Sequence, residues 1–565
     1  MTKLSFQKFG KALFLLILLV LTFSCKNNSE IKETDTDVVL WTSYNDSLEV
    51  AANAEHENSR MRYKLIQSKV LDKNDVFRPL YHEVSRFSEE RYAQIKSMIL
   101  EHDINTIQNH IANNKFSYEE LVLFYLKRIY KYELDNETTL NTVIALNPNV
   151  LEEARSLDKK SKALHPIYGM PILLKDNIGT DNMKTTAGAI ALQDNETNDA
   201  FIIERLKENG ALILGKVNLS EWAYFLCRGC PVGYSAVGGQ TLNPYGRRVF
   251  ETGGSSSGSG TSMAANYAVA AVGTETSGSI LSPSSQNSVV GLKPTIGLLS
   301  RTGIVPISST LDTPGPMTRN VTDNAILLSA MMGHDPKDKA SIKENYAGIY
   351  TSGERPIPLS ELKLGVFKGL IESDSIYKAT IIKLKDAGAE IVEFTPPEVD
   401  MSGFLSILNI DMRNDLPSYI DAEVQDKDAV KITSIKDAVA FNNQDSLVRI
   451  PYGQALFEGI LTDSTTVTGL YGIKIRLEQN GRTYFNDAMD KYDLDAILSI
   501  NNYHAGYAAV AKYPALTIPM GYKESGEPIS LTFIGKQFSE ANLLRMGKTF
   551  EDLTKVRKIP EGYTE

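Results

Sequence analysis

The sequence alternates between short apolar runs and helical segments over most of its length. Residues 171–175 (PILLK) and 211–216 (ALILGK) have the length and composition of buried strands. Between them, residues 201–210 (FIIERLKENG) have helical spacing and end in glycine, a typical helix stop. The alternation returns at residues 363–394 and again from residue 513 onward. Repeated strand–helix–strand order predicts an α/β fold with a large mixed, mostly parallel central sheet and helices on both faces.

The rest of the chain is predicted to form segments around this pattern. Residues 1–24 have the features of a signal peptide, and the polar residues 25–96 indicate a tether and a helical extension. The main domain is expected at residues 97–557, with a mostly helical insertion at about residues 400–490. Residues 117–120 (SYEE) have the pattern of a capping box, so we expect a helix to begin there.

The charge balance restricts the partners of this chain. Its 565 residues include 59 Lys and Arg against 69 Asp and Glu, which gives a formal charge of −10. An acidic surface repels phosphate backbones and anionic lipid headgroups. We therefore expect no nucleic-acid partner and no wide contact with a membrane.

The N-terminal segment has the pattern of an export signal. Lys3, Lys8 and Lys11 precede an apolar run at residues 12–23, which is too short to span a bilayer. The segment ends in LTFSC, and with polar residues after Cys25 it resembles the lipobox of bacterial lipoproteins. The alternative is a plain secretory peptide with an incidental cysteine. We expect an exported lipoprotein, anchored to a membrane only through Cys25 and facing the periplasm or the cell surface.

The two remaining cysteines are close together in the sequence. Cys227 and Cys230 form a CRGC motif, and in an exported protein they are either two structural thiols or one local disulfide. The seven histidines are scattered, without the spacing of a metal site. We expect neither a metal ion nor another cofactor.

A stretch rich in glycine and serine at residues 253–260 (GGSSSGSG) lies inside the alternating pattern. Its composition is typical of linkers, but no completed unit ends there, and it lacks the Lys of a phosphate-binding loop. It also satisfies G-x-S-x-G, which makes Ser256 the nucleophile of a hydrolase elbow if His334 or His504 completes the triad. The small residues 261–272 (TSMAANYAVAAV) that follow predict a tightly packed helix.

A set of motifs in a fixed order resembles a known family. GTETSGSI at residues 273–280 and VVGLKPTIG at residues 289–297 follow the glycine- and serine-rich stretch. Together with NLSEWAYF, GGQTLNPY, LDTPGPMTR and YPALTIPMG, they resemble the amidase signature family over about residues 97–555. Ser255 and Ser279 are 24 residues apart, as are the two catalytic serines of that family. Several motifs are most similar to those of peptide amidases and related bacterial amidases.

The resemblance implies a catalytic domain at residues 97–557 with Lys175, Ser255 and Ser279 as its triad. Ser279 is then the nucleophile, and Ser255 passes its proton to Lys175. Lys175 must be neutral to act as a base, although the ordinary pKa of lysine is about 10.4. A cis peptide bond at Gly254–Ser255 is implied in the same way. The implied oxyanion hole consists of the backbone N–H groups of Thr276, Ser277, Gly278 and Ser279.

The resemblance also implies an activity. It predicts an amidase that converts a small-molecule or peptide carboxamide to a carboxylate and ammonia or an amine. The alternatives are a fatty-acid amide or ester hydrolase, a glutaminase-like subunit acting on charged transfer RNA, and a non-catalytic binding protein. Export and acidic charge argue against the transfer-RNA role. Two departures from the family pattern concern substrate preference, because Ser277 replaces Asp or Gly and Leu281 replaces a common Arg.

Overall fold

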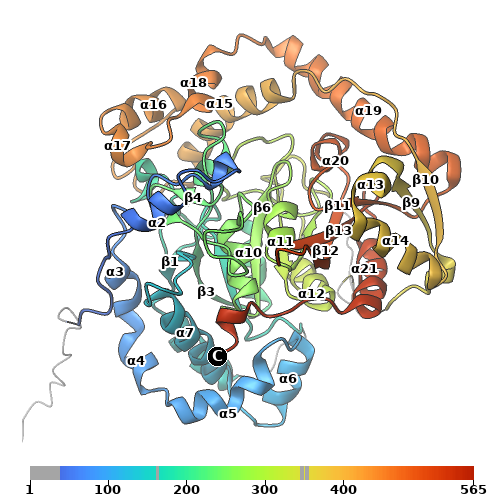
Figure 1. Ribbon diagram of the computed structural model, residues 1–565. Helices are drawn as coiled ribbons and strands as arrows, with labels where there is room; N and C mark the ends of the chain where they lie inside the picture. The colour runs from blue at the N-terminus through green and yellow to red at the C-terminus, as the bar shows by residue number, and fades with distance from the viewer. Residues whose placement is uncertain (1–37, 161–164, 344–348, 350–354) are drawn as a thin grey trace, which may run out of the picture. The chain divides into compact units, whose positions relative to one another are not determined.

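A computed structural model of the protein describes residues 38–160, 165–343, 349 and 355–565, so the predicted signal peptide and Cys25 lie outside it. Within the described residues, eleven strands form one mixed sheet in the unit Leu40–Glu565 (Figure 1). In spatial order the strands are β1 (Val143–Leu146), β3 (Leu212–Val217), β2 (Pro171–Lys175), β6 (Ala270–Glu275), β8 (Thr313–Thr318), β7 (Val290–Lys293), β12 (Ala515–Tyr522), β13 (Pro528–Ile534), β11 (Ala496–Ile500), β9 (Lys363–Phe367) and β10 (Glu390–Phe394). A separate hairpin joins β4 (Tyr234–Ser235) to β5 (Gly239–Gln240).

The sheet combines parallel and antiparallel pairs. β2 runs parallel to β3 and β6, and β9 runs parallel to β10 and β11. From β6 through β8, β7, β12 and β13 to β11 the pairs are antiparallel, as is the pair of β1 and β3. Helical crossovers produce the parallel pairs, since α9 (Phe201–Glu208) joins β2 to β3 and α14 (Ser375–Asp386) joins β9 to β10. The predicted α/β fold with a large mixed central sheet is confirmed, and parallel pairs make up four of the ten strand pairs that its described residues form.

Helices flank the sheet, and those of residues 404–492 lie together along one side of the molecule (Figure 1). The N-terminal helices are α2 (Ser47–Ala52), α3 (Lys73–Phe77), α4 (Tyr81–Arg86), α5 (Glu89–Ile99), α6 (Ile104–Ala112), α7 (Tyr118–Glu133) and α8 (Val150–Asp158). The sheet is further covered by α10 (Ser257–Ala264), α11 (Leu281–Gln286), α12 (Val321–Met331), α13 (Lys368–Ser373), α20 (Ala505–Ala511) and α21 (Glu540–Thr554). Residues 404–492 hold the grouped helices, which are α15 (Phe404–Glu423), α16 (Ile435–Asn443), α17 (Ser446–Arg449), α18 (Ala455–Thr462) and α19 (Val467–Tyr492).

The helix predicted from the capping box is α7. The Ser117 hydroxyl accepts a hydrogen bond from the Glu120 N–H, and the Glu120 carboxylate accepts one from the Ser117 N–H, each at 3.1 Å. Val122, Leu126 and Ile129 recur at helical spacing and are fully buried. Each such side chain stabilises the fold by about 1.5–3 kcal/mol through its burial. The cap and the apolar face together position α7 on the core.

The helix after the glycine- and serine-rich stretch begins earlier than predicted. α10 starts inside that stretch, and residues 270–275 form β6 instead of continuing a helix, so the prediction of one helix over residues 261–272 is wrong. All six residues of β6 are buried, and small apolar residues suit a central strand as well as a tight helix. Gly258 allows α10 to approach its neighbour, because a Cβ there would lie 2.5 Å from the carbonyl oxygen of Asn218.

The segment predicted to be an N-terminal extension contributes to the main core. Met61, Ile66, Phe77 and Val84 are buried in the same apolar cluster as the sheet.

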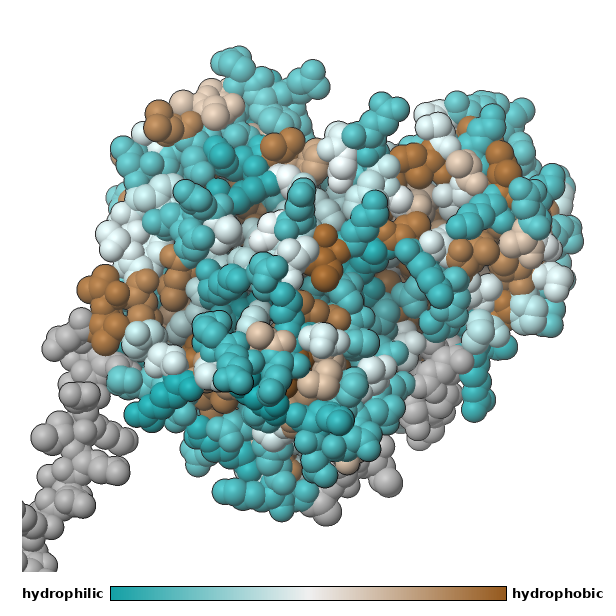
Figure 2. All heavy atoms as spheres, turned by 60° about the horizontal axis from the view of Figure 1, so that its bottom comes forward, coloured by the Kyte–Doolittle hydropathy of each residue, from teal (hydrophilic) through white to brown (hydrophobic). Residues whose placement is uncertain are grey.

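The face of the molecule shown in Figure 2 is largely hydrophilic, with apolar side chains in scattered groups. Among the described residues, none of the helices combines the length and the apolar character required to cross a membrane.

Candidate active site

The predicted site residues meet at the carboxyl ends of two neighbouring parallel strands. Lys175 is the last residue of β2, and the turn at residues 276–279 directly follows β6. Ser255 immediately precedes the short run into α10, which packs against both strands. The Ser256 N–H donates to the carbonyl of Ser279 at 3.2 Å, so the two serine loops are directly joined. The structure therefore brings Lys175, Ser255 and Ser279 to one edge of the sheet.

The Lys175 side chain is fully buried and hydrogen-bonded. Its Nζ donates to the Thr274 hydroxyl at 2.8 Å and to the Thr274 carbonyl at 3.1 Å, and it lies 2.8 Å from Ser255 Oγ. Burial lowers the pKa of Lys175 from 10.5 to about 7, and the negative charges of Asp312 and Glu275 oppose this shift. When Lys175 is neutral, both of its N–H groups can bind Thr274, and its lone pair can accept the proton of Ser255.

Ser255 is held by the backbone around it. The peptide bond Gly254–Ser255 is cis, as the resemblance implied. The Ser255 carbonyl accepts a hydrogen bond from the Ser220 N–H at 3.0 Å. A Cβ on Gly254 would lie 2.4 Å from a methyl group of Val232, so glycine is required at this close approach. The fully buried Ser255 hydroxyl is thereby fixed beside Lys175.

The turn after β6 presents free backbone donors. Within the described residues, the N–H groups of Ser277, Gly278 and Ser279 bind no protein acceptor. Gly278 has a φ of +97°, a conformation that favours glycine. The Glu275 carboxylate closes the turn, since its Oε2 accepts the N–H groups of Ile280 at 2.7 Å and Leu281 at 3.0 Å. Such a turn can stabilise negative charge on a substrate oxygen.

The two serines that competed for the role of nucleophile have different surroundings. Ser279 keeps part of its surface exposed. Ser256 is fully buried, and its hydroxyl donates to the Thr274 carbonyl at 3.0 Å and accepts from the Thr274 N–H at 3.2 Å. His334 is exposed at the end of α12, whereas His504 contacts Ser499 and stacks on Phe367, with ring centroids 3.9 Å apart. This geometry argues against the elbow centred on Ser256.

The position that departs from the family pattern at Leu281 has an apolar environment. Leu281 is 1% exposed and belongs to a cluster with Phe367, Tyr484 and Phe485. An arginine there would bury its charge in this apolar cluster, which is unfavourable without a partner. Ser277 is partly exposed in the turn itself, where its hydroxyl can contact a substrate.

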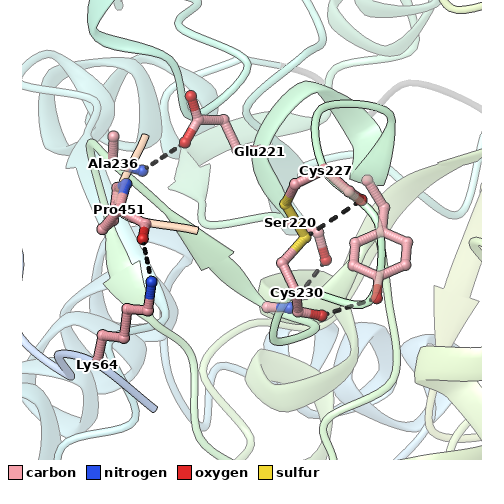
Figure 3. The surroundings of a disulfide bond; sticks show 9 residues. Lys64, Ser220, Glu221, Cys227, Cys230, Ala236 and Pro451 are labelled. Carbon is pink, nitrogen blue, oxygen red and sulfur yellow. Dashed lines mark hydrogen bonds between the residues drawn. A yellow bond between two sulfur atoms is a disulfide. The ribbon is translucent and has the colours of Figure 1, made fainter. Parts of the chain in front are cut away.

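Cys227 and Cys230 form a disulfide near the Ser255 loop (Figure 3). The segment that carries them binds that loop through Ser220, whose hydroxyl also accepts the Gly233 N–H at 2.8 Å. Figure 3 also shows the Glu221 carboxylate accepting the Ala236 N–H, and burial raises the pKa of Glu221 to about 8. Of the two states that the sequence left open for Cys227 and Cys230, the structure has the local disulfide.

Three residues of the site were not singled out from the sequence. Thr274 orients Lys175, Glu275 closes the turn, and Asp312 binds Thr276 through its carboxylate. Thr274 and Glu275 lie within GTETSGSI, and Asp312 lies within LDTPGPMTR, so their motifs were visible but their contacts were not.

A cavity of about 580 Å³ lies apart from the site formed by Lys175, Ser255 and Ser279. Its walls include Leu71, Ile144, Asp176, Met183 and Glu196, and none of the three triad residues lines it. The polar atoms of Lys175 and Ser255 are therefore not exposed to that cavity, and we assign it no part in the chemistry.

The fold and the site can now be compared with known proteins. A family model named Amidase matches residues 120–500, and the chain belongs to this family. A probable amidase of Arabidopsis thaliana is 35% identical over 492 residues, which cover 82% of this chain and 92% of the relative. The family relationship supports a hydrolase that acts on amides.

Two solved structures are similar over most of the chain. An amidase family protein from Bacillus anthracis is 37% identical, with a TM-score of 0.81 over 88% of this chain and 100% of that one. The peptide amidase from Stenotrophomonas maltophilia is 33% identical, with a TM-score of 0.75 over 82% of this chain and 99% of that one.

Proposed function

We propose that this protein hydrolyses carboxamides through a Ser279–Ser255–Lys175 relay and an acyl-enzyme. The observation that carries the proposal is the 2.8 Å contact between the Nζ of the buried Lys175 and Ser255 Oγ. The free donors of the adjoining turn and the partial exposure of Ser279 support it. An amide carbonyl needs both an activated nucleophile and a stabilised oxyanion, and this constellation supplies both.

In the first half of the reaction, Ser279 Oγ forms a bond to the carbonyl carbon. Its proton moves to Ser255, and the proton of Ser255 moves to neutral Lys175. The oxyanion is stabilised by the N–H groups of the turn at residues 276–279. The relay then runs in reverse and protonates the nitrogen, the C–N bond breaks, and ammonia or an amine leaves.

In the second half, water replaces the amine. It attacks the ester on Ser279 and gives its proton to the same relay. The carboxylate product leaves, and the Ser279 hydroxyl is restored. The complete reaction uses water as its only co-substrate and includes no redox step.

We propose peptide amides as the first substrate class to test. The likeness to the peptide amidase of Stenotrophomonas maltophilia supports this choice. Ammonia release is to be measured with peptide amides, free amino-acid amides, glutamine and fatty amides. Turnover of peptide amides that is lost in Ser279→Ala supports the proposal. Preference for fatty amides assigns the other hydrolase role, and no turnover with any panel member favours a non-catalytic protein.

We also propose that the protein is exported and anchored through lipid on Cys25. The lipobox-like sequence LTFSC and the apolar run before it support this placement. A lipoprotein cysteine carries several acyl chains, which are needed for stable anchoring. The wild type is expected in the membrane fraction, and Cys25→Ala in the soluble fraction or unprocessed. Equal membrane recovery of the two forms contradicts the anchor.

A further inference from the structure

The turn that precedes β8 is joined to the oxyanion turn by one carboxylate. Asp312 Oδ1 accepts a hydrogen bond from the Thr276 hydroxyl at 2.5 Å. Its Oδ2 accepts the N–H groups of Ile307 and Ser308, both at 2.8 Å. Because each oxygen binds a different segment, Asp312 fixes the position of Thr276 relative to residues 307–312.

Asp312 also lies close to Thr274, the residue that binds the catalytic lysine. It lines a small pocket together with Thr274, Asn177 and Arg301, and the Thr274 hydroxyl in this pocket is the one that binds Lys175. Burial raises the pKa of Asp312 to about 6, so its carboxylate is charged at neutral pH. Among the groups that favour protonated Lys175, Asp312 has the largest effect.

Glu275 and Arg301 also act on this pair. Glu275 is the second acidic group that acts on Lys175, and its carboxylate holds the backbone of the turn. Arg301 also acts on Asp312, and its guanidinium is paired with Asp338. Asp312 and Glu275 are therefore the two carboxylates whose charge favours protonated Lys175.

The turn at residues 307–312 has a firm support of its own. The hydroxyls of Ser308 and Thr310 both donate to Asp411 Oδ2 of α15 at 2.6 Å. The Ser309 N–H donates to Asp415 Oδ2 of the same helix at 2.7 Å. Asp312 is thus held by a turn that is fixed to the grouped helices.

We propose that Asp312 is a positioning residue of the amidase reaction, an inference that rests on the proposed function. It holds the oxyanion turn through Thr276, and it stabilises the positive charge that forms on Lys175 when Ser279 attacks. In a Ser–His–Asp triad the carboxylate stabilises the imidazolium in a comparable way. The distinctive consequence is that loss of the charge changes both the rate and its pH dependence.

The test uses Asp312→Asn, which keeps the shape and removes the charge. The rate of Ser279 labelling by a fluorophosphonate and the rate of peptide-amide hydrolysis are measured from pH 5 to 9. The midpoint of the acidic limb is expected to move down by about one pH unit, because a nearby opposite charge shifts a pKa by about 1–3 units. The plateau rate is expected to fall by about tenfold, since the protonated lysine loses stabilisation equivalent to one pKa unit.

The matched control is Asp415→Asn, which removes a carboxylate of α15 that binds the same turn at Ser309 and has no hydrogen bond to Thr276 or Lys175. Its midpoint is expected to equal that of the wild type. A midpoint that is the same in Asp312→Asn as in the wild type overturns the inference, as does an equal shift in Asp415→Asn.

A second variant tests the contact to the turn and covers a failure of Asp312→Asn to fold. Thr276→Val keeps the charge of Asp312 but removes the hydroxyl it binds. A lower rate with an unchanged midpoint is expected, and a wild-type rate overturns the positioning role. Lys175→Ala separates this inference from the function on which it rests. If Lys175→Ala is inactive but the Asp312 variant behaves as the wild type, only the inference fails; if Lys175→Ala is active, the proposed function fails.

Discussion

Replacing Lys175 with methionine should abolish activity and, at neutral pH, stabilise the fold. The lysine is fully buried, and its pKa falls from 10.5 to about 7 when the chain folds. Between these values the unfolded chain binds more protons than the folded one, so wild-type stability rises with pH in this window. Below about pH 7 the full penalty of burying the charge is present. Methionine has similar length and no charge, so its variant lacks this dependence.

The size of the effect follows from the pKa change. At pH 7 the penalty is about 4 kcal/mol, because each pKa unit corresponds to about 1.4 kcal/mol. Lys175→Met also loses the hydrogen bonds to Thr274 and Ser255, which contribute about 1 kcal/mol each. A net gain of about 2 kcal/mol is therefore expected at pH 7. At pH 9.5 the wild-type penalty falls to about 1 kcal/mol, so the variant becomes the less stable protein.

The assay compares denaturant midpoints of the two proteins at pH 7 and pH 9.5. Lys536→Met serves as the control for replacing a lysine by methionine, because this lysine is half exposed and lies outside the site. A reversal of the stability order between the two pH values supports a buried, neutral Lys175. The reasoning is refuted if the difference between Lys175→Met and the wild type is the same at both.

Three further predictions concern the loops around the site. Ser255→Ala should slow peptide-amide hydrolysis at least 100-fold, because it removes the hydroxyl that relays the proton to Lys175. Ser256→Ala, measured in parallel, should stay within about tenfold of the wild type. An equal loss in both variants contradicts the role of Ser255 in the relay. Gly278→Ala should lower kcat by about 10²–10³, because alanine strains a φ of +97° and misplaces the donors; an unchanged kcat excludes the turn as oxyanion hole. Cys227→Ser combined with Cys230→Ser should destabilise the fold by about 2 kcal/mol, since the bridged loop is short, and calorimetry that finds no change argues against the bridge.

Much of the fold could be predicted because local pattern and tertiary structure agree. The capping box at residues 117–120 and the buried strand ending at Lys175 carry their signals within a few residues. The boundary of α10 could not be obtained in this way, since residues 270–275 are small and apolar and fit either a tight helix or a central strand. The antiparallel pairs in the middle of the sheet also depend on contacts between distant segments.

The candidate site also contains residues with a local sequence signal and residues whose contacts join distant segments. Lys175, Ser255 and Ser279 could be predicted as site residues because ordered motifs surround them. Asp312 could not, because its role follows from a contact with Thr276 across 36 positions of the sequence. A motif shows which residues are present, but only the fold shows which of them face each other.

The central claim is that Ser279 is the nucleophile of an amidase. A fluorophosphonate is to be reacted with the wild type, and the labelled residue identified by peptide mapping and mass spectrometry. One label is expected, on Ser279, with loss of peptide-amide hydrolysis in proportion to labelling and no label in Ser279→Ala. A label on Ser256, or undiminished labelling of Ser279→Ala, would contradict this claim.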